Sequence, residues 1–332
     1  MTAFSILDLC PVVEGGTVSQ ALAMTRRMAK AAEDADFTRF WLAEHHGMKG
    51  IASAATALVI AEAGHATSTI RIGSGGIMLP NHSPLVIAEQ FGTLESLFPG
   101  RVDLGLGRAP GTDMNTARAL RRNLEAGANS FPNDILELQE LLDDPNERTR
   151  LLAVPGSGAK VPIWLLGSSL YSAHLAAALG LPYAFASHFA PDSLSEALDI
   201  YRSKFKPSSR LTKPYVMAAV MGVMAETDKE AAFLFTTLQQ TFVNMRRNTR
   251  GKMPKPLETM DGYWTETEKM MVDHTLHYAV VGGPENATRQ MRDFITATGA
   301  DEVMISMPIY SDTARLKSVE LFGQMQKELP KK

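Results

Sequence analysis

The sequence predicts a single α/β domain folded as a (β/α)8 barrel of the TIM type, with insertions. Short apolar segments alternate with segments of helical periodicity along almost the whole chain, and this alternation is typical of parallel βα units. Eight such units are found, which favours a closed barrel over an open, doubly wound sheet. The 332 residues are enough for a barrel with insertions, because such barrels typically need about 250. We therefore expect one domain over residues 1–332.

The eight strands are expected where short apolar runs are bounded by turn residues. In chain order they are residues 4–9, 40–42, 70–79, 102–106, 161–166, 183–187, 215–224 and 302–307.

The helices between these strands carry recognisable start and stop signals. Thr17 and Gln20 have the spacing of a capping box, and Thr227 with Glu230 repeats it later in the chain. Gly180 marks a helix end, because glycine readily adopts the left-handed conformation found there. The clearest helices are expected at residues 17–37, 53–65, 85–97, 171–179 and 191–204, with a last one ending near residue 329.

Two segments break the alternation. Residues 143–160 are rich in proline and glycine, and residues 244–273 carry several arginines, lysines and prolines. The second segment is longer than an ordinary connection between elements, so a lid over the active site is one interpretation. A mobile surface loop with solvated charges is the other.

Composition and charge exclude several functional classes. Lys plus Arg total 33 against 36 Asp plus Glu, so nothing attracts nucleic acid or an anionic membrane. Cys10 is the only cysteine, which excludes an intramolecular disulfide and a zinc-thiolate site. The sequence has no signal-peptide pattern and no apolar stretch of about 18 residues. We expect a cytoplasmic protein that acts on a small molecule.

Polar residues follow the predicted second strand, at the barrel end where active sites are built. Glu44, His45 and His46 stand in sequence there. Adjacent side chains in a strand point to opposite sides, so at most one histidine faces the barrel mouth. The two histidines are poorly arranged to share a metal, and no metal site is expected. A general acid–base or cofactor-contacting role remains open beside that of ordinary hydrogen-bonded loop histidines.

Glycines and an arginine end the third and fourth strands. Gly75 and Gly76 mark either a simple bulge or a place where a flat ring lies against bare backbone. On the second interpretation, a valine at Gly76 would block the ring without unfolding the protein. Arg108 follows Gly107 and could clamp a phosphate, with pairing to Asp113 as the structural alternative. The surrounding glycine spacing does not fit a dinucleotide-binding fingerprint.

Small hydroxyl residues follow the fifth strand. Gly167, Ser168 and Ser169 lead into a helix that contains Ser172, and a helix N-terminus with such donors favours a phosphate. Plain serine N-capping is the alternative. After the sixth strand, His188 could touch substrate or cofactor, or cap the next helix. Together these residues describe a cofactor with a terminal phosphate and a large flat ring.

At these residues the sequence resembles the bacterial luciferase-like flavin monooxygenases. Within that family it is most similar to a bacterial branch that carries the Gly-Ser-Ser-x-Tyr-Ser-Ala run seen at residues 167–173. The resemblance extends from about residue 4 to residue 329. The segments that carry it are residues 41–46, 75–84, 100–108, 166–169, 178–182 and 281–285.

The resemblance implies a barrel that binds FMN, often transiently and in its reduced form, FMNH2. By motif position His45 matches the family's catalytic histidine, and the Gly75–Gly76 bond matches a cis non-proline peptide beneath the isoalloxazine. Arg108 and the serines match positions that hold the FMN phosphate. The catalytic candidates are His45, His46 and His188. The cofactor-binding candidates are Glu44, Gly75, Gly76, Gly107, Arg108, Gly167, Ser168, Ser169 and Ser172.

The resemblance also implies a function. We expect a two-component-type monooxygenase that inserts one oxygen atom from O2 into a small organic substrate, with a separate flavin reductase supplying FMNH2. A homodimer formed through the second and third helices is expected. Gly107 replaces the reactive cysteine of luciferase, and Ser187-His188 replaces a tryptophan, which argues against light emission and long-chain aldehyde specificity. The alternatives are a flavin- or deazaflavin-dependent hydride-transfer oxidoreductase and a non-catalytic FMN-binding protein.

Overall fold

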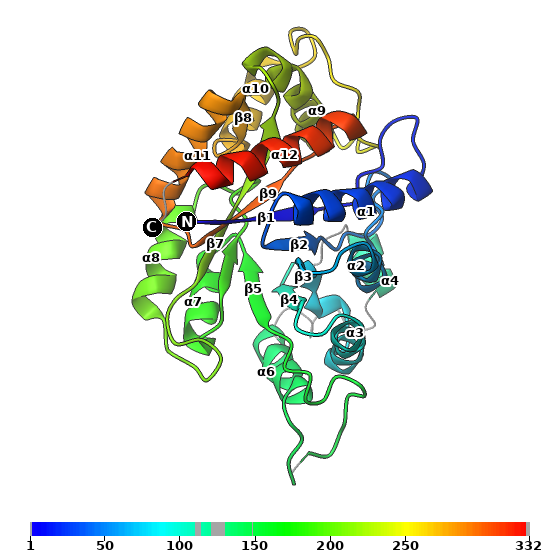
Figure 1. Cartoon of the computed structure of the whole chain (residues 1–332), viewed down its shortest axis with the longest axis vertical. Coiled ribbons are helices and arrows are strands. Elements are labelled where there is room, and N and C mark those ends of the chain that lie inside the picture. Colours follow the sequence, from blue (N-terminus) through cyan, green and yellow to red (C-terminus); the bar gives the residue numbers. More distant parts are fainter. Residues whose placement is uncertain (1, 110–113, 121–129, 148, 330–332) are drawn as a thin grey trace.

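The chain folds into a closed barrel of eight parallel strands surrounded by helices (Figure 1). The computed structural model describes residues 2–109, 114–120, 130–147 and 149–329. Around the barrel the strands run β1-β2-β3-β4-β5-β6-β7-β9, and β9 pairs with β1 to close it. This confirms the predicted fold class. Among the described residues, no helix has the length and apolar character needed to span a membrane.

Every predicted strand is present, with ends within two residues of the predicted bounds. The barrel strands are β1 (Ala3–Asp8), β2 (Arg39–Leu42), β3 (Arg71–Met78), β4 (Val102–Gly107), β5 (Ile163–Gly167), β6 (Tyr183–Phe185), β7 (Val216–Met224) and β9 (Glu302–Ser306). The additional strand β8 (Val280–Gly282) pairs only with the end of β7, outside the barrel.

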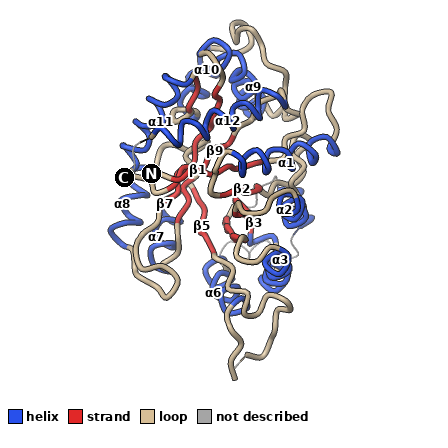
Figure 2. Tube along the Cα trace, viewed as in Figure 1, coloured by secondary structure: helices blue, strands red, loops and turns tan. Residues whose placement is uncertain are grey.

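Helices lie on the outside of the strands (Figure 2). Thr17 and Gln20 form the predicted capping box, and Gly180 ends its helix in the left-handed conformation with φ 61°. The helices are α1 (Val18–Asp34), α2 (Thr56–His65), α3 (Pro84–Leu97), α4 (Met114–Leu120), α6 (Phe131–Leu142), α7 (Leu170–Leu179), α8 (Leu194–Lys204), α9 (Asp228–Arg246), α10 (Glu266–Thr275), α11 (Pro284–Thr298) and α12 (Asp312–Glu328), with a short 3₁₀ helix η1 (Leu79–Asn81).

The barrel interior is packed with large apolar side chains. Trp41 and Trp164 meet edge to face with their ring centroids 5.2 Å apart. Leu7, Met217 and Met304 belong to the same buried cluster. Because side chains fill the interior and leave no channel, a ligand can bind only at an end of the barrel.

A buried ion network lies at the N-terminal end of the strands. Arg39 at the start of β2 pairs with Asp103 at 2.7 Å and with Glu302 at 3.0 Å, and both carboxylate side chains are fully buried. Arg71 adds a second guanidinium to Asp103 at 2.6 Å. These charges are paired with one another, which is how a buried charge is tolerated. The C-terminal ends of the strands therefore form the available mouth.

The segment at residues 244–273 is partly helical and partly bonded to the loop after β1. Its first residues complete α9 and its last ones form most of α10. Between them the backbone of Met253 bonds to Val12 at 2.9 Å and to Glu14 at 2.8 Å, in the loop after β1. Residues 247–257, here called the strap, thus lie at the mouth of the barrel. A lid function for the strap stays a prediction.

Candidate active site

The pairing of neighbouring strands brings the predicted site residues to one end of the barrel. β2, β3, β4, β5 and β6 are consecutive neighbours and all parallel, so the segments that follow them meet at the mouth. Met78 at the end of β3 stands opposite Gly107 at the end of β4. Gly167 at the end of β5 stands opposite Phe185 at the end of β6.

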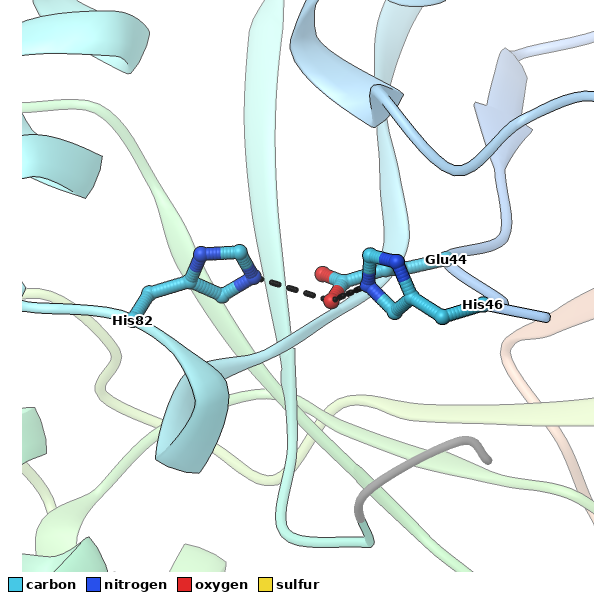
Figure 3. Close-up of side chains that lie close together, drawn as sticks. All are labelled: Glu44, His46 and His82. Carbon is cyan, nitrogen blue, oxygen red and sulfur yellow. Dashed lines mark hydrogen bonds and ion pairs between the residues drawn. The ribbon is translucent and has the colours of Figure 1, made fainter. Parts of the chain in front are cut away.

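Glu44 is the centre of a hydrogen-bonded cluster at this mouth (Figure 3). Its carboxylate is buried, with 1% of its side chain exposed. The oxygen Oε1 lies 2.7 Å from Nε2 of His46 and 2.9 Å from Nε2 of His82. The backbone N–H of Met78 donates to Oε2 at 2.9 Å. The cluster therefore ties the loop after β2 to the end of β3 and to the segment before α3.

The protonation of this cluster follows from its bonds. Burial raises the pKa of Glu44, but the hydrogen bonds from His82, His46 and the Met78 N–H outweigh it and hold the pKa below its usual range. The carboxylate is thus ionised at neutral pH and can only accept hydrogen bonds. Both histidines must donate through Nε2–H. Sequence reasoning missed His82, although it lies in the segment at residues 75–84 that carries the family resemblance.

A carboxylate beside two histidines also has the composition of a metal site. The ligand atoms of Glu44, His46 and His82 all lie within 4.8 Å of one another. However, Oε1 already accepts from two imidazoles, and Oε2 accepts from a backbone N–H. Because the carboxylate is satisfied in this way, we interpret the cluster as a positioning network. The expectation of no metal site stays a prediction.

His45 and His188 form a different pair. His46 turns to Glu44, whereas the ring atom Nδ1 of His45 is buried without a hydrogen-bond partner in the described part of the chain, as is Nδ1 of His188. Burial is the main cause that lowers the pKa of His45. The charge of Glu44 opposes this shift, and His46 and, less strongly, Arg250 add to it. Burial and the nearby His45 lower the pKa of His188 to about 4. Both rings are neutral at pH 7, and their Nδ1 atoms can take part in a hydrogen bond to a ligand.

Because His188 is buried in its neutral form, the protein is expected to become less stable at acidic pH. A histidine of the unfolded chain titrates near pH 6.5, so between about pH 6.5 and pH 4 the unfolded state binds a proton that the folded state does not. The free energy of unfolding is therefore highest above this window and falls by roughly 3 kcal/mol as the pH drops through it. Urea unfolding at several pH values measures the slope. His188→Gln should flatten it, whereas the exposed His277→Gln should not, and equal slopes in all three proteins would contradict the assignment.

Gly75 and Gly76 lie where β3 is irregular. The peptide bond between them is cis, as the resemblance implied. The register with β4 shifts between Ser74 and Ile77, which agrees with the bulge that was one of the two interpretations. A Cβ built at Gly76 would lie 2.7 Å from the carbonyl oxygen of Gly105. The expectation that Gly76→Val would leave the fold intact is thus wrong, because the added side chain would collide with the backbone of β4.

Arg108 lies beside the N-terminus of α7. Its guanidinium carbon is 4.2 Å from the ring centroid of Tyr171, in the first turn of that helix. Ser169 occupies the N-cap position, but its hydroxyl makes no capping bond, so plain capping does not explain this serine. The alternative partner of Arg108, Asp113, lies outside the described residues. A guanidinium beside a free helix N-terminus has the chemistry of a phosphate site.

Two further candidates, Ser172 and Gly167, stabilise the conformation of the loop between β5 and α7. The Ser172 hydroxyl donates to the carbonyl oxygen of Ser169 at 2.7 Å and lies 3.0 Å from the Tyr183 hydroxyl. Ser172 is buried, so it orders the loop and is less available to an anion than the half-buried Ser168. A Cβ at Gly167 would lie 2.3 Å from the Ser172 hydroxyl oxygen. Glycine is therefore needed at Gly167 for the loop to pack on α7.

A closed α/β barrel with its polar groups gathered at the C-terminal ends of the strands has the architecture of the barrel enzymes. The profile of the family described as luciferase-like monooxygenase matches residues 2–302, and the chain belongs to this family. It is 50% identical over 329 residues to the luciferase-like monooxygenase of Escherichia coli K12, with 98% of each chain covered. It is 37% identical over 190 residues to the N-acetyl-S-alkylcysteine monooxygenase of Bacillus subtilis, covering 56% of this chain and 57% of the other.

Solved structures agree on the fold. Apo-MsnO8 superposes with a TM-score of 0.88 at 32% identity, and both chains are fully covered. The oxygenating constituent of 3,6-diketocamphane monooxygenase from Pseudomonas putida, in complex with FMN, gives a TM-score of 0.73 at 18% identity, with 97% of each chain covered. An F420-dependent secondary alcohol dehydrogenase gives 0.70 at 14% identity, with 98% of each chain covered. The same barrel thus serves more than one redox chemistry.

Proposed function

We propose that the protein is an FMN-dependent monooxygenase that uses O2 and receives reduced FMN from a separate flavin reductase. The observation that carries this proposal is the pair of buried, neutral histidines, His45 and His188, with unpartnered ring nitrogens at the barrel mouth. The family and the FMN complex of the camphane enzyme support it. The product is a small organic molecule that has gained one oxygen atom.

The residues at the mouth fit the parts of FMN. Arg108 and the N-terminus of α7, with Ser168 and Ser169, offer a cation and N–H donors for the phosphate. By the family resemblance, the flat ring would lie against the backbone at Gly75 and Gly76. When bound, reduced flavin supplies the activation of O2. His45 holds a proton at one ring nitrogen and leaves the other for a ligand, and the apolar interior beneath excludes water.

Arg108→Ala is expected to weaken FMN binding by roughly 2 kcal/mol, because a charge-assisted contact to phosphate is lost. Quenching of FMN fluorescence measures the dissociation constant. Riboflavin, which lacks the phosphate, serves as the control ligand and should bind the variant and the wild type equally. An unchanged dissociation constant for FMN would remove Arg108 from the phosphate site.

Labelled oxygen tests the reaction type. With a flavin reductase, NADH and FMN, thioethers and ketones are offered under ¹⁸O2, and the products are analysed by mass spectrometry. The proposal predicts one ¹⁸O atom per product molecule. The hydride-transfer alternative, which the F420-dependent neighbour represents, predicts oxygen-independent turnover without label. A protein that only binds FMN would give no turnover.

We also propose a homodimer formed through α2 and α3. Apolar side chains on these helices are exposed, with Leu58 at 71%, Leu97 at 51% and Val86 at 43%. α2 and α3 contact each other, and exposed apolar side chains on adjoining helices are typical of an interaction surface. Light scattering after size-exclusion chromatography should give twice the 36.1 kDa chain mass, and Leu58→Asp should shift it toward the monomer. A monomeric wild type at micromolar concentration would contradict this interface.

A further inference from the structure

The strap is fixed to the loops that follow β1 and β2. The N–H of Val12 donates to the carbonyl of Gly50 at 2.9 Å, and the N–H of Met253 donates to the carbonyl of Val12 at 2.9 Å. A Cβ at Gly50 would lie 2.4 Å from the carbonyl oxygen of Gly251, so the two backbones are in direct contact. The strap therefore rests on the loop that carries His45 and His46.

The other side of the strap is fixed to α9. The Thr237 hydroxyl donates to the carbonyl of Pro254 at 3.2 Å, and the Gln240 side chain donates to the carbonyl of Lys255 at 2.8 Å. Both side chains on α9 are buried. The strap backbone thus contacts the loops after β1 and β2 on one side and α9 on the other, and these contacts fix its position at the mouth.

The cations of this region differ in their partners. Arg247 pairs with Glu268 at 2.6 Å, Arg246 donates to the Thr275 hydroxyl at 2.9 Å, and Lys252 donates to the carbonyl of Gly16 at 2.6 Å. Within the described ranges the exposed side chains of Arg250 and Lys255 pair with no carboxylate. Of the two, only Arg250 directly precedes the contact between Gly251 and Gly50. Its positive charge is the smallest of the causes that lower the pKa of His45, after burial and His46, which agrees with a position of the strap beside the loop after β2.

We propose that Arg250 binds an acidic group of the substrate, so that the enzyme acts on small organic carboxylates held over His45. A guanidinium presents parallel N–H donors that match a carboxylate. The FMN phosphate has its own cation, Arg108, after β4, whereas the strap rests on the loops after β1 and β2. β3 separates these positions along the barrel wall. This inference rests on the proposed function and adds the class of substrate.

Matched acid and amide ligands test the inference. The probes are 4-(methylthio)butanoate, hexanoate and phenylacetate, each with its primary amide, and calorimetry gives their dissociation constants with the FMN-loaded protein. We expect the wild type to bind at least one acid more tightly than its amide. Arg250→Ala should weaken binding of that acid roughly tenfold or more and leave the amide unchanged, since a charge-assisted bond is lost. Arg250→Lys should retain part of the preference.

The controls separate this inference from the proposed function. Lys255→Ala removes an exposed cation of the same strap and should leave the preference for the acid intact. FMN affinity is measured for every variant and should not change in Arg250→Ala. An equal affinity of the wild type for acid and amide throughout the panel overturns the inference, as does an equal loss of both ligands in Arg250→Ala. Because these titrations need no turnover, they test the role of Arg250 even if the protein does not transfer oxygen.

Discussion

Replacing Glu44 by alanine is expected to lower the free energy of unfolding by about 3–5 kcal/mol, the range found when one partner of a buried charged network is removed. The variant would leave the Nε2–H groups of His46 and His82 and the N–H of Met78 without their acceptor. An unsatisfied donor in a buried site costs its full desolvation. Urea unfolding followed by circular dichroism measures the loss.

Two companion variants make this prediction specific. Glu44→Gln keeps one carbonyl acceptor but replaces the second oxygen by a donor, so an intermediate loss is expected. Glu258→Ala removes an exposed glutamate and should change stability by less than about 0.5 kcal/mol. A loss below about 1 kcal/mol for Glu44→Ala would show that the cluster does not hold the mouth together.

His45→Ala is expected to lower kcat/KM for oxygen transfer by roughly 10²- to 10⁴-fold, the usual contribution of a positioned proton-transferring group. Because the anion-binding groups after β4 and β5 are untouched, the FMN dissociation constant should change little. The separation of these two effects distinguishes a catalytic group from one that shapes the cofactor site. Steady-state turnover with a substrate identified by ¹⁸O labelling gives the first quantity, and fluorescence titration gives the second.

His277→Ala is the matched control, since this histidine is exposed and lies outside the mouth, next to β8. It should retain wild-type turnover. If His45→Ala kept kcat/KM within a few-fold of the wild type, His45 would lose its role and His188 would become the candidate. If FMN affinity fell in parallel with turnover, His45 would be a binding residue.

The barrel could be predicted from sequence because each of its strands is a separate apolar run bounded by turn residues. Apart from the short η1, the elements that were missed lie between β7 and β9, and they are β8, α10 and α11. β8 has three residues, too few for a pattern, and α10 begins inside the segment interpreted as a possible lid. A signal for α10 was present, because Thr265 and Glu268 form a capping box.

The candidate site could be predicted only in part. Glycines and polar residues after successive strands located the mouth, since parallel strands must end at the same side. The sequence did not show that Glu44 engages His46 and His82, because that contact depends on the pairing of β2 with β3 and on the turn at η1. For the same reason the sequence does not distinguish Arg250 from any other charge of a surface loop. The contact of the next residue, Gly251, with Gly50 shows that Arg250 lies beside the loop after β2.

Stopped-flow mixing of the protein with anaerobically reduced FMN, and then with oxygenated buffer, shows whether this barrel controls the reaction of reduced flavin with O2. We expect a lasting flavin absorbance that matches neither reduced nor oxidised FMN and that precedes the spectrum of oxidised FMN. Arg108→Ala at the same FMN concentration should show less of it. Reoxidation in one step, at the rate of free reduced FMN, would overturn the proposed monooxygenase function, because the barrel mouth would then not control the reaction of flavin with O2.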